Sequence, residues 1–495
     1  MNDNSSFTLM LKLNTNKNDL IWLDKIFFHG NHLYNVCVKE AIKRINKFKE
    51  DPIVNNIFKE YFRTKKLTNE QKKILKDKRA QYQIDNKYCL EKYLNVCRKK
   101  YANYIDADTC SKISLRVYDS IEKFLFKKGK KIHFKKYKDF CSIASKTNKQ
   151  GIKFRNNEII YQGRHFPIII KDNDEYTKEC FLDEFGFERK IKFCRIKRKW
   201  HKHNYCYYAE IVFEGTPPKK DRTMGKGNVG IDIGTSTIAA VGDNNIIFKE
   251  LDDGINKIDS EIKRLNRKAD RQRRANNPDN YNPDGTIRRN TKTFKKKWVV
   301  SKNQKLTYDK IKTLYKKRSA KLEYFQNLLS NEILTLGSDI KIENMSFQGL
   351  QKRAKKTEKN IKGKYKKKKR FGKSIQIHAP SALIEKVITK ARYFGNIVTK
   401  INTTSVKASQ LNHITGEYKK AELNQRWEHL DKDINVQRDL YSAYLIKNVN
   451  EDNKTINIED CIKGFDNFFK LHNDLIKTLK NEKKEGKLFP SCMGI

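Results

Sequence analysis

The sequence predicts a multidomain α+β protein in which a small N-terminal β-barrel or sandwich, interrupted by a block of helices, precedes a C-terminal α/β domain. Three observations lead to this prediction. Apolar residues recur at helical spacing from Asp19 to about Phe126, they alternate at strand spacing from about Ile159 to Glu214, and both periods occur after Asn228. The polar stretch 216–228, T-P-P-K-K-D-R-T-M-G-K-G-N, is the predicted linker between the two halves.

The N-terminal half begins with a predicted strand at residues 7–14, F-T-L-M-L-K-L-N. Leu67-Thr68-Asn69-Glu70 is typical of a helix start, and Ile113, Val117, Ile121 and Leu125 recur at a spacing of four. We therefore expect a long helical insertion after the first strand of the barrel.

Strands follow the helical block. Residues 159–161 and 166–170 are short strand candidates, and 195–214 predicts a hairpin that turns at 201–204. Tyr207 and Phe213 share one face of the second hairpin strand with Ala209 and Ile211. After the linker, the order is hairpin, long helices, strand, basic loop, helix, strand and helix, which indicates an α/β domain.

The charge balance indicates a polyanionic partner. The 495 residues include 107 Lys and Arg against 58 Asp and Glu, a formal net charge of +49. A Lys-rich codon bias would raise Glu as well, and the acids are not raised. Nucleic acid is therefore the expected partner, and an anionic membrane surface is the main alternative. No long apolar run, basic amphipathic anchor or signal-peptide pattern supports the membrane.

The ten cysteines do not follow a metal-binding or disulfide pattern. No two of them have C-x-x-C spacing, and the chain is long for a secreted disulfide framework. Buried free thiols in a reducing cytoplasm are the simplest interpretation.

The first candidate for chemistry lies in residues 229–241, V-G-I-D-I-G-T-S-T-I-A-A-V. This pattern predicts two apolar strands around a Gly turn, with Asp232 as the one carboxylate. Burial of an unpaired carboxylate is costly, so we expect a cation or a strong partner beside it. The Gly234-Thr235-Ser236 turn also resembles the phosphate-binding turn of the sugar-kinase and actin superfamily, so this motif by itself leaves both interpretations open.

Two further acids complete the candidate site. Glu343 ends a short predicted strand in D-I-K-I-E-N-M-S (339–346), where by itself it could equally face solvent. Asp439 opens an amphipathic helix in V-Q-R-D-L-Y-S-A-Y-L-I (436–446), although an acid in a first helical turn is often only a cap. Asp433 is a competing candidate six residues earlier.

Together the three acids follow the RNase H arrangement: one in a first strand, one at the end of a later strand and one at a C-terminal helix. Such folds bring three carboxylates around two metal ions that act on a phosphodiester. Oxygen ligands favour Mg²⁺ or Mn²⁺ over Zn²⁺. Asp232, Glu343 and one acid near the last helix, Asp439 or Asp433, are therefore the candidate ligands of such metal ions.

In this order the motifs resemble the transposon-encoded TnpB nucleases and their descendants, the miniature type V (V-F) CRISPR effectors. The resemblance extends from about Ser111 to Val449 and rests on five segments: I-D-I-G-T-S at 231–236, I-E-N-M-S at 342–346 with the basic loop after it, Ala379-Pro380-Ser381, Ser409-Gln410, and Q-R-D-L-Y-S-A at 437–443. The family follows its last acid with small residues three and four positions on, which Ser442 and Ala443 supply after Asp439. The resemblance therefore implies that Asp232, Glu343 and Asp439, and not Asp433, are the catalytic and metal-binding residues.

The resemblance implies a guide-directed DNA endonuclease in which a wedge-type β-barrel with an inserted recognition domain precedes a RuvC-like nuclease domain of RNase H fold. The implied parts are the first wedge strand (1–18), the helical recognition domain (19–127), the rest of the wedge barrel (128–215), the linker (216–228), the RuvC-like domain (229–402), a target-nucleic-acid-binding insertion (403–432), and the RuvC completion with C-terminal helices (433–495).

The densest basic segment, 352–370, contains twelve Lys or Arg and one acid. It is either a solvated loop or a surface for a phosphate backbone, and we expect the second. The predicted nucleic-acid contacts are Lys352, Arg353, Lys355, Lys356, Lys364, Lys366, Lys367, Lys368, Lys369 and Arg370, together with Arg271, Arg273, Arg274 and Arg438.

One departure from the family concerns zinc. The family usually carries two C-x-x-C pairs between Ser409-Gln410 and the last acid, whereas this chain has no cysteine from 207 to 460. His413 and His429 are isolated, so we expect a degenerate ribbon without zinc, packed around Trp427.

The partners that the resemblance implies are a guide RNA and target double-stranded DNA, with no membrane, in the bacterial cytoplasm and at the nucleoid when the target is bound. A monomer and a homodimer on one guide RNA both remain open. Three alternatives share some of these features: a nuclease-inactive guide-directed repressor, a transposase-type strand transferase of RNase H fold, and a nucleic-acid-coating protein.

Overall fold

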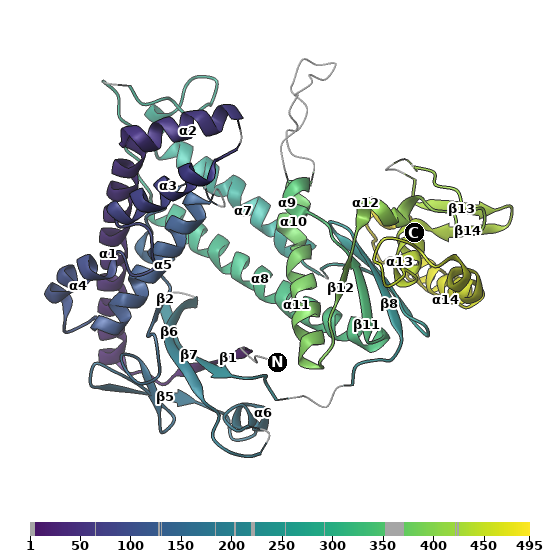
Figure 1. The fold of residues 1–495 in the computed structure, drawn as a ribbon, viewed down its shortest axis with the longest axis horizontal. Helices are drawn as coiled ribbons and strands as arrows, with labels where there is room; N and C mark the ends of the chain where they lie inside the picture. The colour runs from purple at the N-terminus through teal and green to yellow at the C-terminus, as the bar shows by residue number, and fades with distance from the viewer. Residues whose placement is uncertain are drawn as a thin grey trace. The chain divides into compact units, whose positions relative to one another are not determined.

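The computed structural model describes residues 5–64, 66–126, 129, 131–183, 185–201, 204–218, 223–252, 254–291, 293–351, 371–420, 422 and 425–495. The chain divides into two compact units, 1–220 and 221–495 (Figure 1). Their division falls inside the segment 216–228. Each unit is described by itself.

The first unit is built on a seven-stranded antiparallel sheet in the order β2-β6-β7-β1-β5-β4-β3. The strands are β1 (Ser6–Leu13), β2 (Ser142–Ala144), β3 (Lys153–Arg155), β4 (Glu158–Tyr161), β5 (Arg164–Ile169), β6 (Ile191–His201) and β7 (Asn204–Glu214). Tyr207, Ala209, Ile211 and Phe213 are all buried on β7, which confirms the face predicted from their alternation.

Helices are inserted after the first strand, as predicted: α1 (Lys17–Glu50), α2 (Pro52–Thr64), α3 (Asn69–Gln81), α4 (Glu91–Arg98) and α5 (Ala107–Leu125). Thr68 caps α3 through a reciprocal bond pair with Gln71, which confirms the predicted helix start. Helix α1 packs on the sheet, where the ring of Phe27 lies 5.7 Å from that of Tyr207. The helices and the sheet therefore share one core.

The second unit contains a five-stranded sheet in the order β10-β9-β8-β11-β12. Its strands are β8 (Asn228–Ile233), β9 (Thr237–Val241), β10 (Ile246–Glu250), β11 (Asp339–Glu343) and β12 (Thr399–Ile401). The pairs β8–β9 and β9–β10 are antiparallel, whereas β11 runs parallel to both β8 and β12. The first strand of the unit thus lies at the centre of the sheet.

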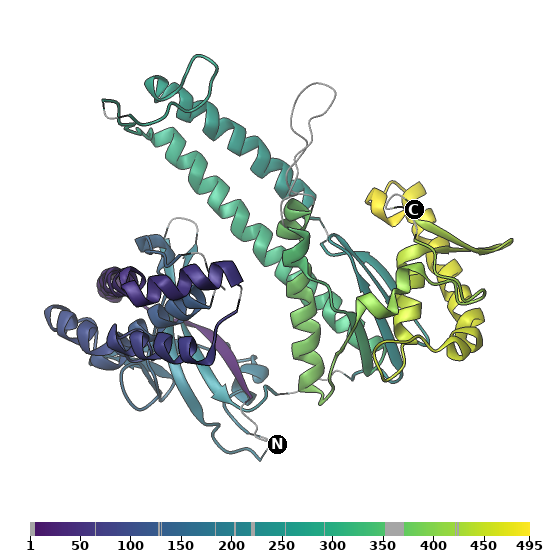
Figure 2. The ribbon, with the colours of Figure 1, turned by 45° about the horizontal axis from the view of Figure 1, so that its top comes forward.

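Helices cover both faces of this sheet (Figures 1 and 2). One face packs against α8 (Lys302–Leu336) and α11 (Pro380–Tyr393), and the other against α13 (Arg438–Lys447) and α14 (Ile458–Lys484). The remaining elements are α7 (Asn256–Ala275), α9 (Phe347–Leu350), α10 (Gly372–His378), α12 (Thr403–Val406), β13 (Trp427–Asp431) and β14 (Ile434–Gln437).

Side chains along β8 alternate between the two faces of the sheet, so its apolar residues and its carboxylate face opposite sides. Val229, Ile231 and Ile233 belong to the core on the α8 and α11 side. Because side chains alternate along a strand, Gly230 and Asp232 face α13. The single carboxylate of the strand therefore points toward the helix that Asp439 opens.

Strands β2, β3 and β10 were not predicted from the sequence. In β10, Ile246, Ile247 and Phe248 are all buried. The expected boundary between 432 and 433 falls in the turn of a hairpin, because β13 pairs with β14 across it. Among the described residues, no helix has both the length and the apolarity to cross a membrane.

Candidate nuclease site

Asp232 and Glu343 lie on neighbouring strands and on the same face of the sheet. In the parallel pair of β8 and β11, Ile231 is aligned with Ile342, so the two acids are the next residues along each strand. Ile340 and Ile342 enter the core on the opposite face, which leaves Lys341 and Glu343 on the α13 side. The sheet register thus places both carboxylates together.

Asp439 is brought to them by the close approach of α13 to β8. A Cβ on Gly230 would lie 2.0 Å from the carbonyl oxygen of Ala443 and 2.3 Å from the backbone nitrogen of Lys447. Only a glycine permits this contact between strand and helix backbones. The start of α13 is fixed by Gln437, whose side-chain oxygen accepts a hydrogen bond from the N–H of Leu440 at 2.9 Å.

Asp232 is affected by the charges of both other candidate acids. Burial raises the pKa of Asp232 well above its usual value, and the charges of Glu343 and Asp439 raise it further, while Arg438 opposes them. Burial also raises the pKa of Glu343. In the conformation seen, no three Asp, Glu, His or Cys side chains among the described residues are close enough to hold a metal ion. Asp232 therefore lies within range of the charges of Glu343 and Asp439, but the three acids do not form a finished chelating cluster.

The geometry favours Asp439 over Asp433. Asp439 contributes to the pKa of Asp232, and its side chain keeps about 20% of its surface exposed. Asp433 is exposed in the turn between β13 and β14. The acid at the start of the helix, and not the acid in the hairpin turn, shares the electrostatic environment of the sheet carboxylates.

The raised pKa of Asp232 predicts a stability effect. Because the folded state holds this proton more tightly than the unfolded chain, the stability associated with Asp232 is present below about pH 4 and is lost as the pH rises through its folded pKa. Asp232→Asn is therefore expected to raise the melting temperature near neutral pH in the presence of a chelator. The gain should shrink toward pH 4, and thermal melts across pH would measure it. A lower melting temperature for Asp232→Asn at every pH would contradict this expectation.

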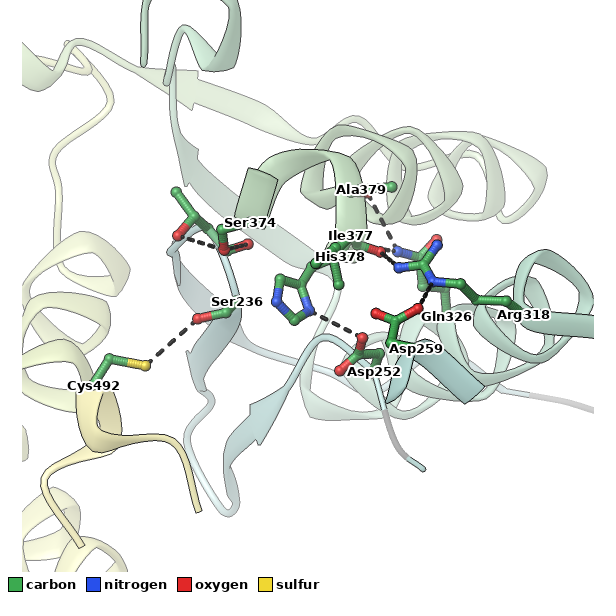
Figure 3. Close-up of polar contacts among 11 residues, drawn as sticks. Ser236, Asp252, Asp259, Arg318, Gln326, Ser374, Ile377, His378, Ala379 and Cys492 are labelled. Carbon is green, nitrogen blue, oxygen red and sulfur yellow. Dashed lines mark hydrogen bonds and ion pairs between the residues drawn. The ribbon is translucent and has the colours of Figure 1, made fainter. Parts of the chain in front are cut away.

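Helix α10 is held beside the turn that follows Asp232 (Figure 3). The hydroxyl of Ser374 donates to the backbone oxygen of Thr235 at 3.2 Å. At the other end of α10, Nδ1 of His378 lies 3.0 Å from the buried carboxylate of Asp252. Helix α10 is the first described element after residue 370.

A second set of contacts ties the α10–α11 junction to α8 (Figure 3). Arg318 donates to the carbonyl of Ile377 at 2.7 Å and forms an ion pair with Asp259 at 2.6 Å. Gln326 donates to the carbonyl of His378 at 2.9 Å. These bonds satisfy the last carbonyls of α10, which have no partner within the helix itself.

The predicted nucleic-acid contacts divide into two groups. Those between Lys352 and Arg370 lie outside the described residues. Arg271 is exposed on α7, while Arg273 and Arg274 both pair with Asp270, at 2.6 and 3.2 Å. Arg438 donates to the carbonyl of Gln425 at 2.8 Å and approaches Asp439 at 3.4 Å, so it supports the loop before α13.

The Cys-free insertion is packed through aromatic and histidine side chains. Nδ1 of the buried His413 lies 2.7 Å from the hydroxyl of Tyr441, and its ring lies 4.7 Å from that of Phe465. Burial lowers the pKa of His413. His429 is exposed. Trp427 donates to the carbonyl of Gly494 at 3.0 Å and packs against the α13–α14 core.

A cavity of about 210 Å³ lies next to this insertion. Asn412, Glu428 and Arg438 are among its lining residues. Burial raises the pKa of Glu428. None of the three candidate acids is among the residues that line this cavity.

Two supporting residues were missed in the sequence. Nζ of Lys341 donates to the carbonyl of Val449 at 2.6 Å, which ties β11 to the end of α13. Gly230 permits the backbone contact described above. A glycine in the interior of a strand often marks the close approach of another backbone, so Gly230 between Val229 and Ile231 could have indicated this contact from the sequence.

Among known proteins, similarity to this chain was found only in solved structures. No protein-family model matches the chain, and no curated protein matches it. A cryo-EM structure of a Cas12f1–sgRNA–target DNA complex is similar over 89% of this chain and 98% of that chain, with 10% identity and a TM-score of 0.42. A CRISPR–Cas12f ternary complex is similar over 87% of this chain and 82% of that chain, with 14% identity and a TM-score of 0.24.

Proposed function

We propose that this protein is an RNA-guided DNA endonuclease with a single RuvC-like site formed by Asp232, Glu343 and Asp439. The observation that carries the proposal is the placement of three acids from β8, the end of β11 and the start of α13: the sheet register aligns the first two, and the backbone contact of α13 with β8 brings the helix of the third. They come from segments far apart in the sequence, and each had been predicted as part of one site. Asp232 also lies in an otherwise apolar strand, where a carboxylate without a function is costly.

The donor set suits a hard divalent cation. Three carboxylates supply only oxygen ligands, which fits Mg²⁺ or Mn²⁺. When bound, these ions would stabilise the attacking and leaving oxygens of a phosphodiester. The chain's own part is to hold Asp232 and Glu343 in register and to bring Asp439 to them through the contact of α13 with β8. Zinc is not part of the proposal, since His413 is engaged with Tyr441.

The rest of the chain would hold the nucleic acids. A net charge of +49 suits a guide RNA and a target DNA duplex. We infer that the sheet of the first unit is the wedge-type domain, that helices α1 to α5 form the recognition domain, and that the second unit is the RuvC-like domain. In such a system base pairing reads the target, and the protein reads only a short flanking motif and duplex shape.

Exchange of the guide tests this function. The protein is purified with each of two guide RNAs and given two plasmids, each carrying one target. Cleavage in Mg²⁺ is expected to follow the guide, and Asp232→Asn with the same guide is expected to bind the matching plasmid without cutting it. Cutting at one fixed DNA sequence whichever guide is supplied would overturn the proposal in favour of a strand transferase.

A further inference from the structure

The connection between α7 and α8 is longer than an antiparallel helix pair requires. Helix α7 ends at Ala275 and α8 begins at Lys302, so 26 residues separate the two helices. We term the described residues among them, 276–291 and 293–301, the α7–α8 tip. Helix pairs are usually joined by about 2–8 residues, and ordered loops beyond about 15 residues are usually functional. In Figure 2, this tip lies at the end of the helix pair that is remote from the five-stranded sheet.

The tip is ordered by buried asparagines. Oδ1 of Asn277 accepts from the N–H of Val299 at 2.6 Å, and its Nδ2 donates to the carbonyls of Val299 and Arg273, both at 2.9 Å. Nδ2 of Asn280 donates to the carbonyl of Lys297 at 2.7 Å. Only 6% of Asn277 and 4% of Asn280 are exposed. The beginning of the loop, at Asn277 and Asn280, is thus fixed to its end, at Lys297 and Val299, by side-chain amides.

Apolar packing does not account for this order. The described apolar cluster between α7 and α8 consists of Leu265, Ala269 and Ile311, with Leu314 beside it, and none of these lies in the tip. By contrast, Trp298, Val299 and Val300 in the tip expose 42%, 62% and 53% of their surfaces. The loop therefore holds apolar side chains in solvent on a polar framework, which indicates a surface for a partner.

Guanidinium groups and aromatic rings alternate on this surface. The guanidinium carbon of Arg274 lies 5.3 Å from the ring centre of Tyr281, and that of Arg273 lies 5.6 Å from Trp298. The Tyr281 and Trp298 rings meet edge to face at 6.0 Å. Flat aromatic and guanidinium faces are what unpaired bases stack upon.

The tip also carries exposed cations that are available for phosphates. Arg289, Lys295 and Lys297 are exposed, and within the described part of the chain none of them pairs with an acid. The tip contains only two acids, Asp279 and Asp284. Of these, Asp284 accepts from the N–H and the hydroxyl of Thr286 in its own turn. The tip therefore combines stacking faces with uncompensated positive charge, which complements a single-stranded nucleic acid.

We propose that the α7–α8 tip binds an unpaired segment of the guide RNA, with a base stacked on Trp298 and phosphates at Arg289, Lys295 and Lys297. This inference rests on the proposed function for the identity of the strand. Arg318 contacts α10 next to the candidate site, and Lys302 lies sixteen residues away on the same helix, or about 24 Å at 1.5 Å per residue. A surface so far from the acids suits the constantly bound RNA better than the strand being cut.

Binding titrations test the surface. The full-length protein is titrated with oligoadenylate RNA at several salt concentrations, and the triple variant Arg289→Ala/Lys295→Ala/Lys297→Ala is compared with a control. Three lost phosphate contacts should flatten the log-affinity against log-salt slope by about 2, at about 0.7 per contact for single strands. The control is Lys463→Ala/Lys470→Ala/Lys477→Ala, three exposed lysines of α14, and its slope should equal that of the wild type.

Substitution of Trp298 separates stacking from charge. Trp298→Ala should weaken binding by roughly tenfold with an unchanged salt slope, and Trp298→Phe should restore most of the affinity, because a flat ring is retained. Equal slopes for the tip and α14 triple variants, or wild-type affinity in Trp298→Ala, would overturn the proposal.

Photocross-linking in the assembled complex identifies the strand. With thiouridine-labelled guide RNA and target DNA present, RNA adducts are expected on peptides from 276–301. Adducts with DNA only, or with another protein or a second copy of the chain, would overturn the assignment to guide RNA. If the wild-type protein retained no RNA, the proposed function itself would be refuted. If the complex cleaved DNA as the guide directs but no RNA adduct formed on peptides from 276–301, only this inference would be refuted.

Discussion

Asp232→Asn, Glu343→Gln and Asp439→Asn are each expected to lower Mg²⁺-dependent DNA cleavage by about a thousandfold or more. Metal positioning supplies several kcal/mol of transition-state stabilisation, and about 4 kcal/mol corresponds to a thousandfold in rate. Guided DNA binding should be largely retained, because contacts with the phosphate backbone supply the affinity. Cleavage and binding are measured on the same labelled duplex.

Asp433→Asn is the matched control for these variants. Asp433 is an acid only six residues from Asp439, but it is exposed in the β13–β14 turn. The Asp433→Asn variant should therefore cleave DNA at the wild-type rate. Full activity of Asp439→Asn together with loss of activity in Asp433→Asn would exchange the two residues in the site.

Gly230→Ala is expected to unfold or distort the second unit although it adds a single methyl group. That methyl would meet backbone atoms of Ala443 and Lys447 at 2.0 and 2.3 Å, and a backbone cannot move aside as a flexible side chain can. Overpacking costs about 1–3 kcal/mol, and this contact belongs at the upper end. A fall in melting temperature of roughly 6–12 °C should result, with loss of cleavage because α13 carries Asp439.

Gly349→Ala is the comparison for this change. Its added methyl would meet only the side chain of Ser346, at 3.3 Å from Oγ and 3.6 Å from Cβ, and the position is helical. It should leave the melting temperature nearly unchanged. If the Gly230→Ala variant had the same melting temperature and cleavage rate as the Gly349→Ala variant, then the contact at Gly230 would not be what holds α13 on β8.

The acidic residues of the candidate site were easier to predict from the sequence than the contacts that hold their strands and helix together. Asp232 stood out because a carboxylate in an apolar strand conflicts with burial, and Glu343 because it ends such a strand. The bond from Lys341 to the end of α13 links residues more than 100 positions apart, and no local pattern encodes it. Strand β10 escaped prediction because a short apolar run has no period of its own.

The α7–α8 tip escaped prediction for a different reason. Its asparagines, prolines and glycine have the composition of an ordinary solvated loop. Only the structure shows that Asn277 and Asn280 are buried and that they fix the backbone. Composition indicates where a helix pair turns, but it does not distinguish an ordered loop from a mobile one.

The origin of the three acids in distant segments has a consequence for synthesis of the protein. A ribosome finishes β8 with Asp232 more than 200 residues before it reaches Asp439. Until α13 has left the exit tunnel and packed on the sheet, a nascent chain can already engage nucleic acid through its basic surface but has no complete site. The proposed nuclease would therefore be harmless to the messenger and chromosome around it during translation, and ribosome-stalled chains that end before residue 438 should bind nucleic acid without cutting it.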